Sequence, residues 1–141
     1  MKVIECIEPN DNIYFVRKVF DDLKIDKANY KWVISDLDLV PMYHGDYSGI
    51  GGEEKKSVAF DFVRKMEQEK VAIVDIDEMY CIFEDTQTIR NGVFICLSNE
   101  YDIEMDTYRP KVEGRNTNQF YDERAKYEIR ILDGSLFFIL Q

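Results

Sequence analysis

The sequence has few basic residues, one histidine and no long apolar run. Its 18 lysines and arginines stand against 28 aspartates and glutamates, which gives a net charge of −10, and no third of the chain is basic. Because nucleic-acid affinity comes largely from Lys and Arg neutralising phosphates, we expect no DNA or RNA partner. The same balance argues against binding to an anionic membrane surface. The longest apolar run, Leu136 to Leu140, is far too short to span a bilayer, so no membrane segment is expected.

Cysteine is also scarce. Cys6, Cys81 and Cys96 each lie in an apolar, strand-like run, which indicates buried free thiols in a reducing compartment. No CxxC or Cys/His spacing suggests zinc, and we expect no cofactor. Glu5 interrupts what would be the apolar core of a signal peptide, so no export signal is expected. These observations predict a cytoplasmic protein.

The composition that remains is that of a folded domain rich in strands. The chain of 141 residues is 45% hydrophobic and 13% aromatic, and Val, Ile, Tyr and Phe are abundant. This length suits a single domain, residues 1–141, with a core of its own.

The hydrophobic pattern predicts two helices early in the chain and strands late. Helices are expected at 12–24, with Asn10 or Asp11 as the cap, and at 53–70. Strands are expected at 2–8, 30–40, 71–83 (with a bend at Asp77-Glu78 if it is two strands), 92–98, 101–106, 126–132 and 135–140. Residues 84–91 are predicted to turn and 107–118 to form a loop, while 120–126 can be either helix or strand. Asp133-Gly134 is the turn of a C-terminal hairpin.

This order, β-α-β-α-β-β-β-β, predicts an α+β fold. We expect one mostly antiparallel sheet of about five to six strands, with both helices packed on one face. A parallel α/β fold would need crossover helices after Val71, and the pattern offers none.

The glycine-rich stretch 49–52 precedes the second predicted helix, as a phosphate-binding loop does. However, it lacks the Lys-Ser/Thr ending of a P-loop. Glu53 and Glu54 also occupy the first turn, where they would repel a phosphate. Phosphate binding is therefore not expected.

A metal-dependent enzyme is the alternative hypothesis. Asp36 and Asp38 are two residues apart on a predicted strand and so share a face, and His44 and Asp46 follow. Carboxylates with one imidazole can bind Mg²⁺ or Mn²⁺. Asp75 and Asp77 form a second pair of the same kind. Nucleophilic catalysis would have to use His44 with Ser48 or Cys81, and no nucleophile elbow (GxSxG) is present.

An acidic surface bearing tyrosines is the leading hypothesis. No Lys or Arg occurs between Lys70 and Arg90, and the segment from 101 to 106 alternates acidic with apolar residues. Tyrosine among charged residues is typical of protein interfaces. The expected binding surface consists of Asp75, Asp77, Tyr80, Tyr101, Asp102, Glu104, Asp106 and Tyr108. The small basic patch of Arg109, Lys111 and Arg115 is expected to pair with nearby carboxylates.

In size, acidity and lack of a catalytic motif, the chain is similar to small cytoplasmic immunity or inhibitor proteins, which neutralise a basic partner. This resemblance rests on bulk properties and on no particular residues. It implies a non-enzymatic module that binds a basic protein. A third hypothesis is a structural or regulatory subunit that oligomerises through a sheet edge.

Overall fold

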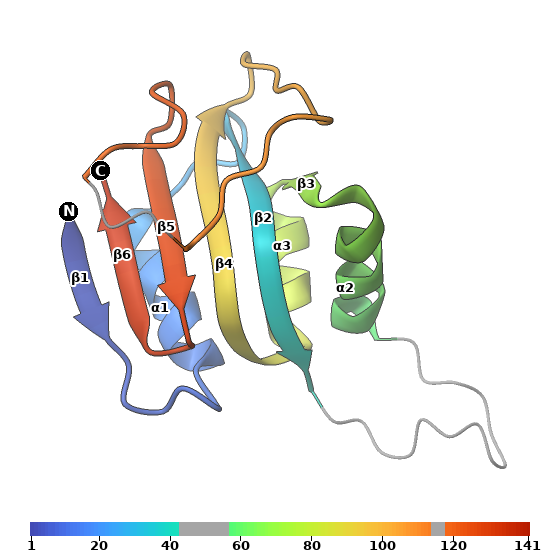
Figure 1. Cartoon of the computed structure of the whole chain (residues 1–141), viewed down its shortest axis with the longest axis vertical. Helices are drawn as coiled ribbons and strands as arrows, with labels where there is room; N and C mark the ends of the chain where they lie inside the picture. The colour runs from blue at the N-terminus through green and yellow to red at the C-terminus, as the bar shows by residue number, and fades with distance from the viewer. Residues whose placement is uncertain (43–56, 114–117) are drawn as a thin grey trace, which may run out of the picture.

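The computed structural model describes residues 1–42, 57–113 and 118–141. These residues form one six-stranded sheet in the order β1-β6-β5-β4-β2-β3, and every neighbouring pair is antiparallel (Figure 1). The elements are β1 (Lys2–Glu5), α1 (Ile13–Leu23), β2 (Tyr30–Pro41), α2 (Val58–Glu69), β3 (Val71–Val74), α3 (Ile76–Glu84), β4 (Thr86–Ser98), β5 (Tyr127–Leu132) and β6 (Leu136–Leu140). The predicted α+β class, the antiparallel sheet and the C-terminal hairpin are confirmed, with a third helix added.

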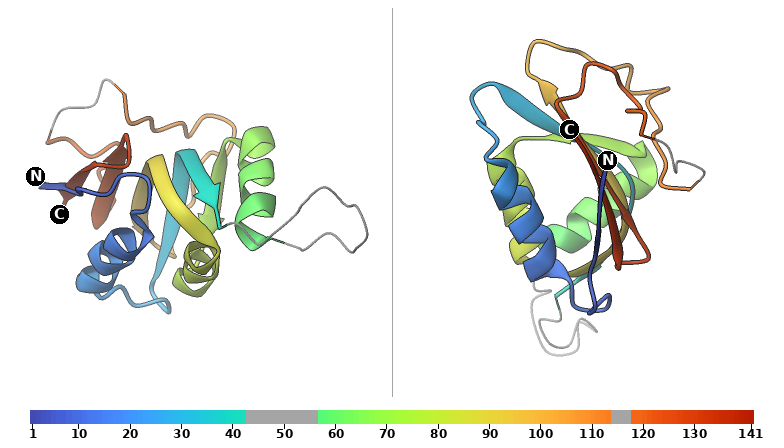
Figure 2. Two further views of the ribbon diagram at one scale, coloured as in Figure 1. Left: turned by 90° about the horizontal axis from the view of Figure 1, so that it is seen from below. Right: turned by 90° about the vertical axis from the view of Figure 1, so that its left-hand side faces the viewer.

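The helices build the larger core on one face of the sheet. Figure 2 shows α1 and α3 side by side beneath the sheet, with α2 at the edge formed by β2 and β3. The ring of Phe20 on α1 meets Trp32, Phe83 and Phe94 in edge-to-face contacts, with centroids 4.9, 5.3 and 5.2 Å away. The indole N–H of Trp32 has no acceptor among the described residues. Packing alone therefore holds this ring.

A long connection covers the other face of the sheet. The described residues 99–113 and 118–126, called the strap below, leave the end of β4 and return to β5 across the strands (Figure 2). Tyr108 and Val112 of the strap are buried against a second apolar cluster that includes Val33, Val93 and Ile95. Both faces of β4 are therefore buried, as its continuous apolar run, 92–98, predicted.

The structure differs most from the predicted elements at α3. Residues 76–84 form a helix where a strand was expected, and β3 is limited to Val71–Val74. The Asp75 carboxylate caps the helix by accepting from the Glu78 amide at 2.8 Å, and the Glu78 side chain accepts from the Asp75 amide. Asp75 and Asp77 are thus not a pair on one strand face. Cys81 lies exposed on this helix, so the prediction that it is buried is also wrong.

β4 begins at Thr86, so the polar turn predicted at 84–91 is wrong as well. Two buried threonines there satisfy their hydroxyls within the fold. Thr86 donates to the Ile82 carbonyl at 2.6 Å and Thr88 to the Pro9 carbonyl at 2.7 Å. Polar residues can therefore occupy a buried strand at this point.

No strand forms in the described residues of the strap. The strand predicted at 101–106 is wrong. Tyr101 and Ile103 are half-buried, and Ile103 packs against the second cluster, but Met105 is exposed, so the alternation holds only in part. Residues 120–126 are neither helix nor strand. The described residues 107–113 and 118 form loop, as predicted.

Asn12, rather than Asn10 or Asp11, precedes α1, and its side chain does not cap the helix. Its amide donates to the carbonyls of Ile89 and Gly134 at 2.8 and 2.9 Å, and its oxygen accepts from the Ile89 N–H at 2.8 Å. This buried side chain ties α1 to β4 and to the hairpin turn. In that turn Asp133 and Gly134 both have positive φ angles, 53° and 71°, as the sequence predicted for a tight hairpin.

None of the helices in the described ranges is long and apolar enough to cross a membrane.

Candidate functional site

The residues of the predicted acidic surface fall into two groups. The first group lies on α3. Asp75 caps the helix, and Asp77 forms an exposed ion pair with Lys27 at 2.7 Å. The Tyr80 hydroxyl donates to the Asp21 carboxylate at 2.5 Å, and burial together with this carboxylate raises the pKa of Tyr80. This tyrosine therefore links α3 to α1.

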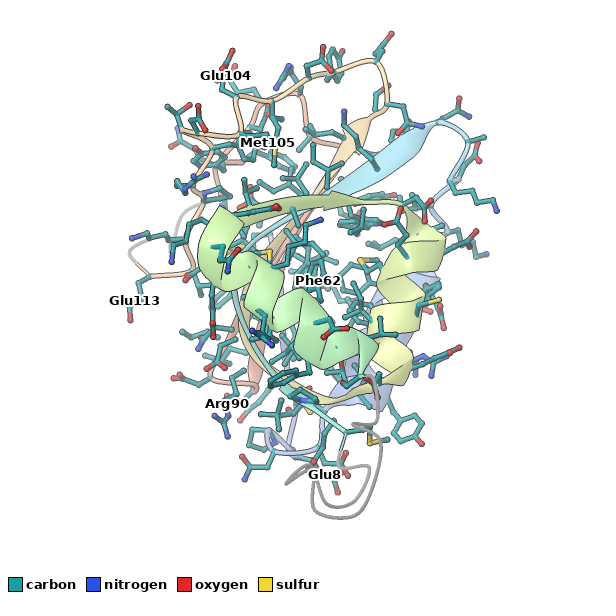
Figure 3. The ribbon with its side chains drawn as sticks, turned by 90° about the vertical axis from the view of Figure 1, so that its right-hand side faces the viewer. Glu8, Phe62, Arg90, Glu104, Met105 and Glu113 are labelled. Carbon is teal, nitrogen blue, oxygen red and sulfur yellow. The ribbon has the colours of Figure 1, made fainter. Side chains whose placement is uncertain are left out.

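The second group lies on the strap. Asp102, Glu104 and Asp106 are exposed, and their carboxylates form no hydrogen bond or ion pair within the described parts of the chain. Between them Met105 is 39% exposed. Figure 3 shows Glu104 and Met105 at the opposite end of the molecule from Glu8 and Arg90. These carboxylates are free to meet a partner.

Tyr108 is the exception within the strap group. It is 8% exposed, its ring contacts Tyr121 edge-to-face, and its hydroxyl donates to Asp122 at 3.1 Å. Burial and the Asp122 carboxylate raise the pKa of Tyr108. Tyr108 is therefore a buried residue that joins two parts of the strap through its contacts with Tyr121 and Asp122.

Both groups adjoin the end of the sheet where β2 begins and β4 ends. The segment 26–31 lies between them. Asn99 donates its backbone N–H to the Asn29 carbonyl at 2.8 Å and its side-chain amide to the Ala28 carbonyl at 3.1 Å, while Lys27 reaches Asp77. We call this surface the acidic end. Its carboxylates are Asp26, Asp75, Asp77, Glu78, Glu100, Asp102, Glu104 and Asp106.

The cations at the acidic end are engaged locally. Lys31 donates to the Tyr101 carbonyl. Arg124 pairs with Asp122 at 2.9 Å and stacks over the Tyr101 ring, with its guanidinium carbon 5.0 Å from the centroid. The hydrogen bonds from Arg124 hold the pKa of the Asp122 carboxyl below its usual range. Arg124 also donates to the Asp102 carbonyl at 3.2 Å, so cations lie beside this segment. The carboxylates of Asp102, Glu104 and Asp106 themselves form no ion pair among the described residues.

The proposed metal ligands are only partly within the described structure. Asp36 lies in a β-bulge, in which it and Leu37 together oppose Gly92 alone, and Asp38 follows the bulge. Asp36 has a φ of 51°, so the regular strand alternation behind the prediction of a shared face is broken. Its carboxylate accepts from the Val112 N–H at 2.9 Å. His44 and Asp46, like Ser48 and residues 49–54, lie outside the described residues.

Within the described ranges, no three His, Cys, Asp or Glu side chains gather closely enough to hold a metal ion. Asp36 instead anchors the strap, together with Ser35, whose hydroxyl donates to the Pro110 carbonyl at 2.9 Å. The structure therefore gives this aspartate a structural role, and the metal hypothesis stays a prediction that depends on His44 and Asp46.

Beside this bulge lies a groove of about 660 Å³. β2, the C-terminal half of α2 and the strap form its walls. It is lined by Ser35, Asp36, Leu37, Asp38, Val63, Met66, Glu67, Lys70, Arg109 and Lys111. Arg109, Lys111 and Arg115 were expected to pair with nearby carboxylates. Arg115 lies outside the described residues, and neither Arg109 nor Lys111 forms an ion pair in the described chain. The Arg109 guanidinium donates to the carbonyls of Met105 and Tyr108 at 2.6 and 2.8 Å.

A buried ion pair was missed by the sequence reasoning. Glu128 and Arg130 on β5 are both fully buried, with 2.5 Å between Oε2 and Nε. The second Glu128 oxygen accepts from the Tyr121 N–H at 2.7 Å, and Arg130 donates to the Gln119 carbonyl at 2.6 Å. The pair therefore binds the strap to the sheet. The signal was present as two charges inside the apolar run YEIRIL.

The remaining nucleophiles offer no catalytic arrangement in the described residues. Burial raises the pKa of the Cys96 thiol to about 12, which makes it a poor nucleophile at neutral pH. Cys6 is buried as well, and Cys81 is exposed on α3.

β1 forms an open sheet edge with Val3 52% exposed, so the hypothesis of assembly through an edge stays a prediction.

No protein-family model matches the chain, and neither the curated proteins nor the solved structures contain a significant match to it.

Proposed function

We propose that the protein is a non-enzymatic binding module, of the immunity or inhibitor type, that engages a basic protein through its acidic end. One observation carries the proposal: the carboxylates of Asp102, Glu104 and Asp106 are exposed and have no partner in the described structure. A cationic surface can supply these carboxylates with partners of opposite charge.

Electrostatic attraction should supply most of the binding to a basic partner, and apolar contact should supply a small part. Exposed carboxylates close together repel one another, and a basic partner relieves this repulsion while it steers the encounter. The exposed part of Met105 adds an apolar contact at the centre of the charged segment. We place the module in the cytoplasm, since its three cysteines are all unpaired, which suits a reducing compartment.

The test is affinity capture from the lysate of the source cell with two charge-reversed variants of equal net charge. Asp102→Lys/Glu104→Lys changes the acidic end. Glu8→Lys/Asp11→Lys changes two exposed carboxylates elsewhere: Glu8 lies at the opposite end of the molecule (Figure 3), and the Asp11 N–H donates to the Glu8 carbonyl at 3.1 Å. The wild type and the second variant should retain the same basic proteins, and the first variant should lose them. If the first variant retains them as well, or if the captured proteins are not basic, the proposal is wrong.

A further inference from the structure

The groove beside the β2 bulge has the dimensions of a ligand site. Its volume of about 660 Å³ lies within the range of small-molecule clefts, which is roughly 300–1,000 Å³. Its strap wall is fixed in place, because Ser35 and Asp36 bond the main chain at Pro110 and Val112. The β2 wall is fixed too: an added Cβ at Gly92 would lie 3.3 Å from the side chain of Leu37, so the bulge packs closely on β4.

Charges of both signs line the groove without pairing. The acidic groups are Asp36, Asp38 and Glu67, and the basic groups are Lys70, Arg109 and Lys111. No ion pair joins the two sets within the described chain. Leu37, Val63 and Met66 supply apolar surface between them. A simple anion would meet the carboxylates here and a simple cation would meet the lysines, so neither alone satisfies this lining.

Beside the groove, β2 also has no strand partner on its α2 side within the described residues. β3 pairs with Trp32–Ser35 only, so β2 is without this partner from Asp36 onward. Unpaired strand edges accept extended peptides through main-chain hydrogen bonds. A ligand that brings an amine, a carboxylate, amide groups and an apolar side chain would use every part of the lining.

We propose that this groove binds a short peptide with free amino and carboxyl termini and an apolar side chain. The amino terminus lies toward the carboxylates of Asp38 and Glu67, and the carboxylate lies toward Lys70 and Lys111. The apolar side chain rests on Val63 and Met66. This site is separate from the acidic end and does not depend on the function proposed for it.

The test is an amide NMR titration of the full chain with alanyl-leucyl-alanine, its N-acetylated form and its C-amidated form. Shifts should be confined to residues 35–38, 63–70 and 109–112. Blocking either terminus should weaken binding about tenfold, the effect of losing one charge-assisted contact. Inorganic phosphate and acetate serve as probes of simple anion binding, and they should bind far more weakly than the free peptide.

Three variants assign the two ends of the peptide. In Asp38→Asn, N-acetylation should cost little further affinity. In Lys111→Ala, C-amidation should cost little. Lys65→Ala, an exposed change on α2 that lies outside the groove lining, should behave as the wild type. The proposal is overturned if the free peptide does not bind, if blocked peptides bind as well as the free one, if phosphate binds as tightly, or if the shifts lie elsewhere. An unchanged unfolding midpoint shows that each variant is folded.

Discussion

Asn12 shows how one side chain can join three parts of a fold. It is 1% exposed and satisfies both main-chain groups of Ile89 and the carbonyl of Gly134. Removing it would leave three buried main-chain groups without partners. The cost of such groups, rather than the strength of the lost bonds, decides the effect of a substitution here.

Asn12→Ala should lower the free energy of unfolding by about 3 kcal/mol, which is near the upper end for single substitutions. Urea unfolding monitored by the fluorescence of Trp32, the one tryptophan, measures this directly, since its ring is fully buried. Asn99→Ala is the matched control, because its bond to Ala28 is exposed, and it should cost less than about 1 kcal/mol. Equal effects of the two changes would contradict the bridging role of Asn12.

Sequence patterns correctly predicted the structural role of residues whose partners are close in the chain. The Asp133-Gly134 turn and the apolar stripe of α1 were found because turn geometry and helical periodicity depend on neighbouring residues alone. The role of Asp36 could not be found in this way. Its partner, Val112, is far along the chain, and a bulge leaves no mark in the alternation of apolar and polar residues. The buried Glu128–Arg130 pair differs, because its two charges inside the apolar run YEIRIL were a local signal, but their contacts with Tyr121 and Gln119 of the strap were not.

At the scale of elements, the hydrophobic pattern was most misleading at α3, where it predicted a strand and the structure has a helix. Most of its residues are apolar or aromatic, and its nine residues are too few for a strong helical period. The decisive signal was Asp75 followed by Glu78 three residues later, which is the pattern of a capping box. The predicted α+β class is nevertheless correct, because a third helix on the same face adds to the core without changing the sheet.

Asp75→Ala should destabilise the protein by about 1 kcal/mol through loss of the cap of α3. Asp77→Ala, two residues on in the first turn, should cost less than about 0.5 kcal/mol, since it breaks only an exposed ion pair with Lys27. Urea unfolding of both variants gives the comparison. A larger cost for Asp77 than for Asp75 would contradict the capping box.

The stability of the strap should depend on pH through the charge of Asp122. Asp122 accepts from Arg124 and from Tyr108, and its pKa is lowered in the folded state. A depressed carboxyl pKa adds stability that is complete above the unfolded value of about 3.9 and is lost as the pH falls through the folded pKa. The acid limb of the stability curve should therefore carry the contribution of Asp122.

Asp122→Asn should destabilise the protein at pH 7, and its difference from the wild type should shrink once the pH falls below about 4. Urea midpoints between pH 2.5 and 7 measure this difference. Asp106→Asn, whose carboxylate has no partner in the described residues, should track the wild type throughout. A difference for Asp122→Asn that is the same at pH 3 and pH 7 would contradict the assignment.

At the scale of the whole molecule, the sheet is covered on both faces, by helices on one and by the strap on the other (Figure 2). Negative charge is left on the surface. At the acidic end Asp77 pairs with Lys27, while the carboxylates of Asp102, Glu104 and Asp106 form no ion pair in the described chain. The sequence predicted that this charge meets a partner, but it placed all eight residues on one surface. The structure puts Tyr108 inside the strap and Tyr80 between α3 and α1, so the exposed acidic groups of 100–106 are the part that carries the proposal.

Amide hydrogen exchange of the complex with a captured basic partner tests the central claim most directly. The account predicts added protection at residues 99–107, 26–31 and 75–78, and protection that weakens as salt is raised. It predicts none at β1 or on the outer face of α2. Protection confined to β1 or to α2, or protection insensitive to salt, would contradict it.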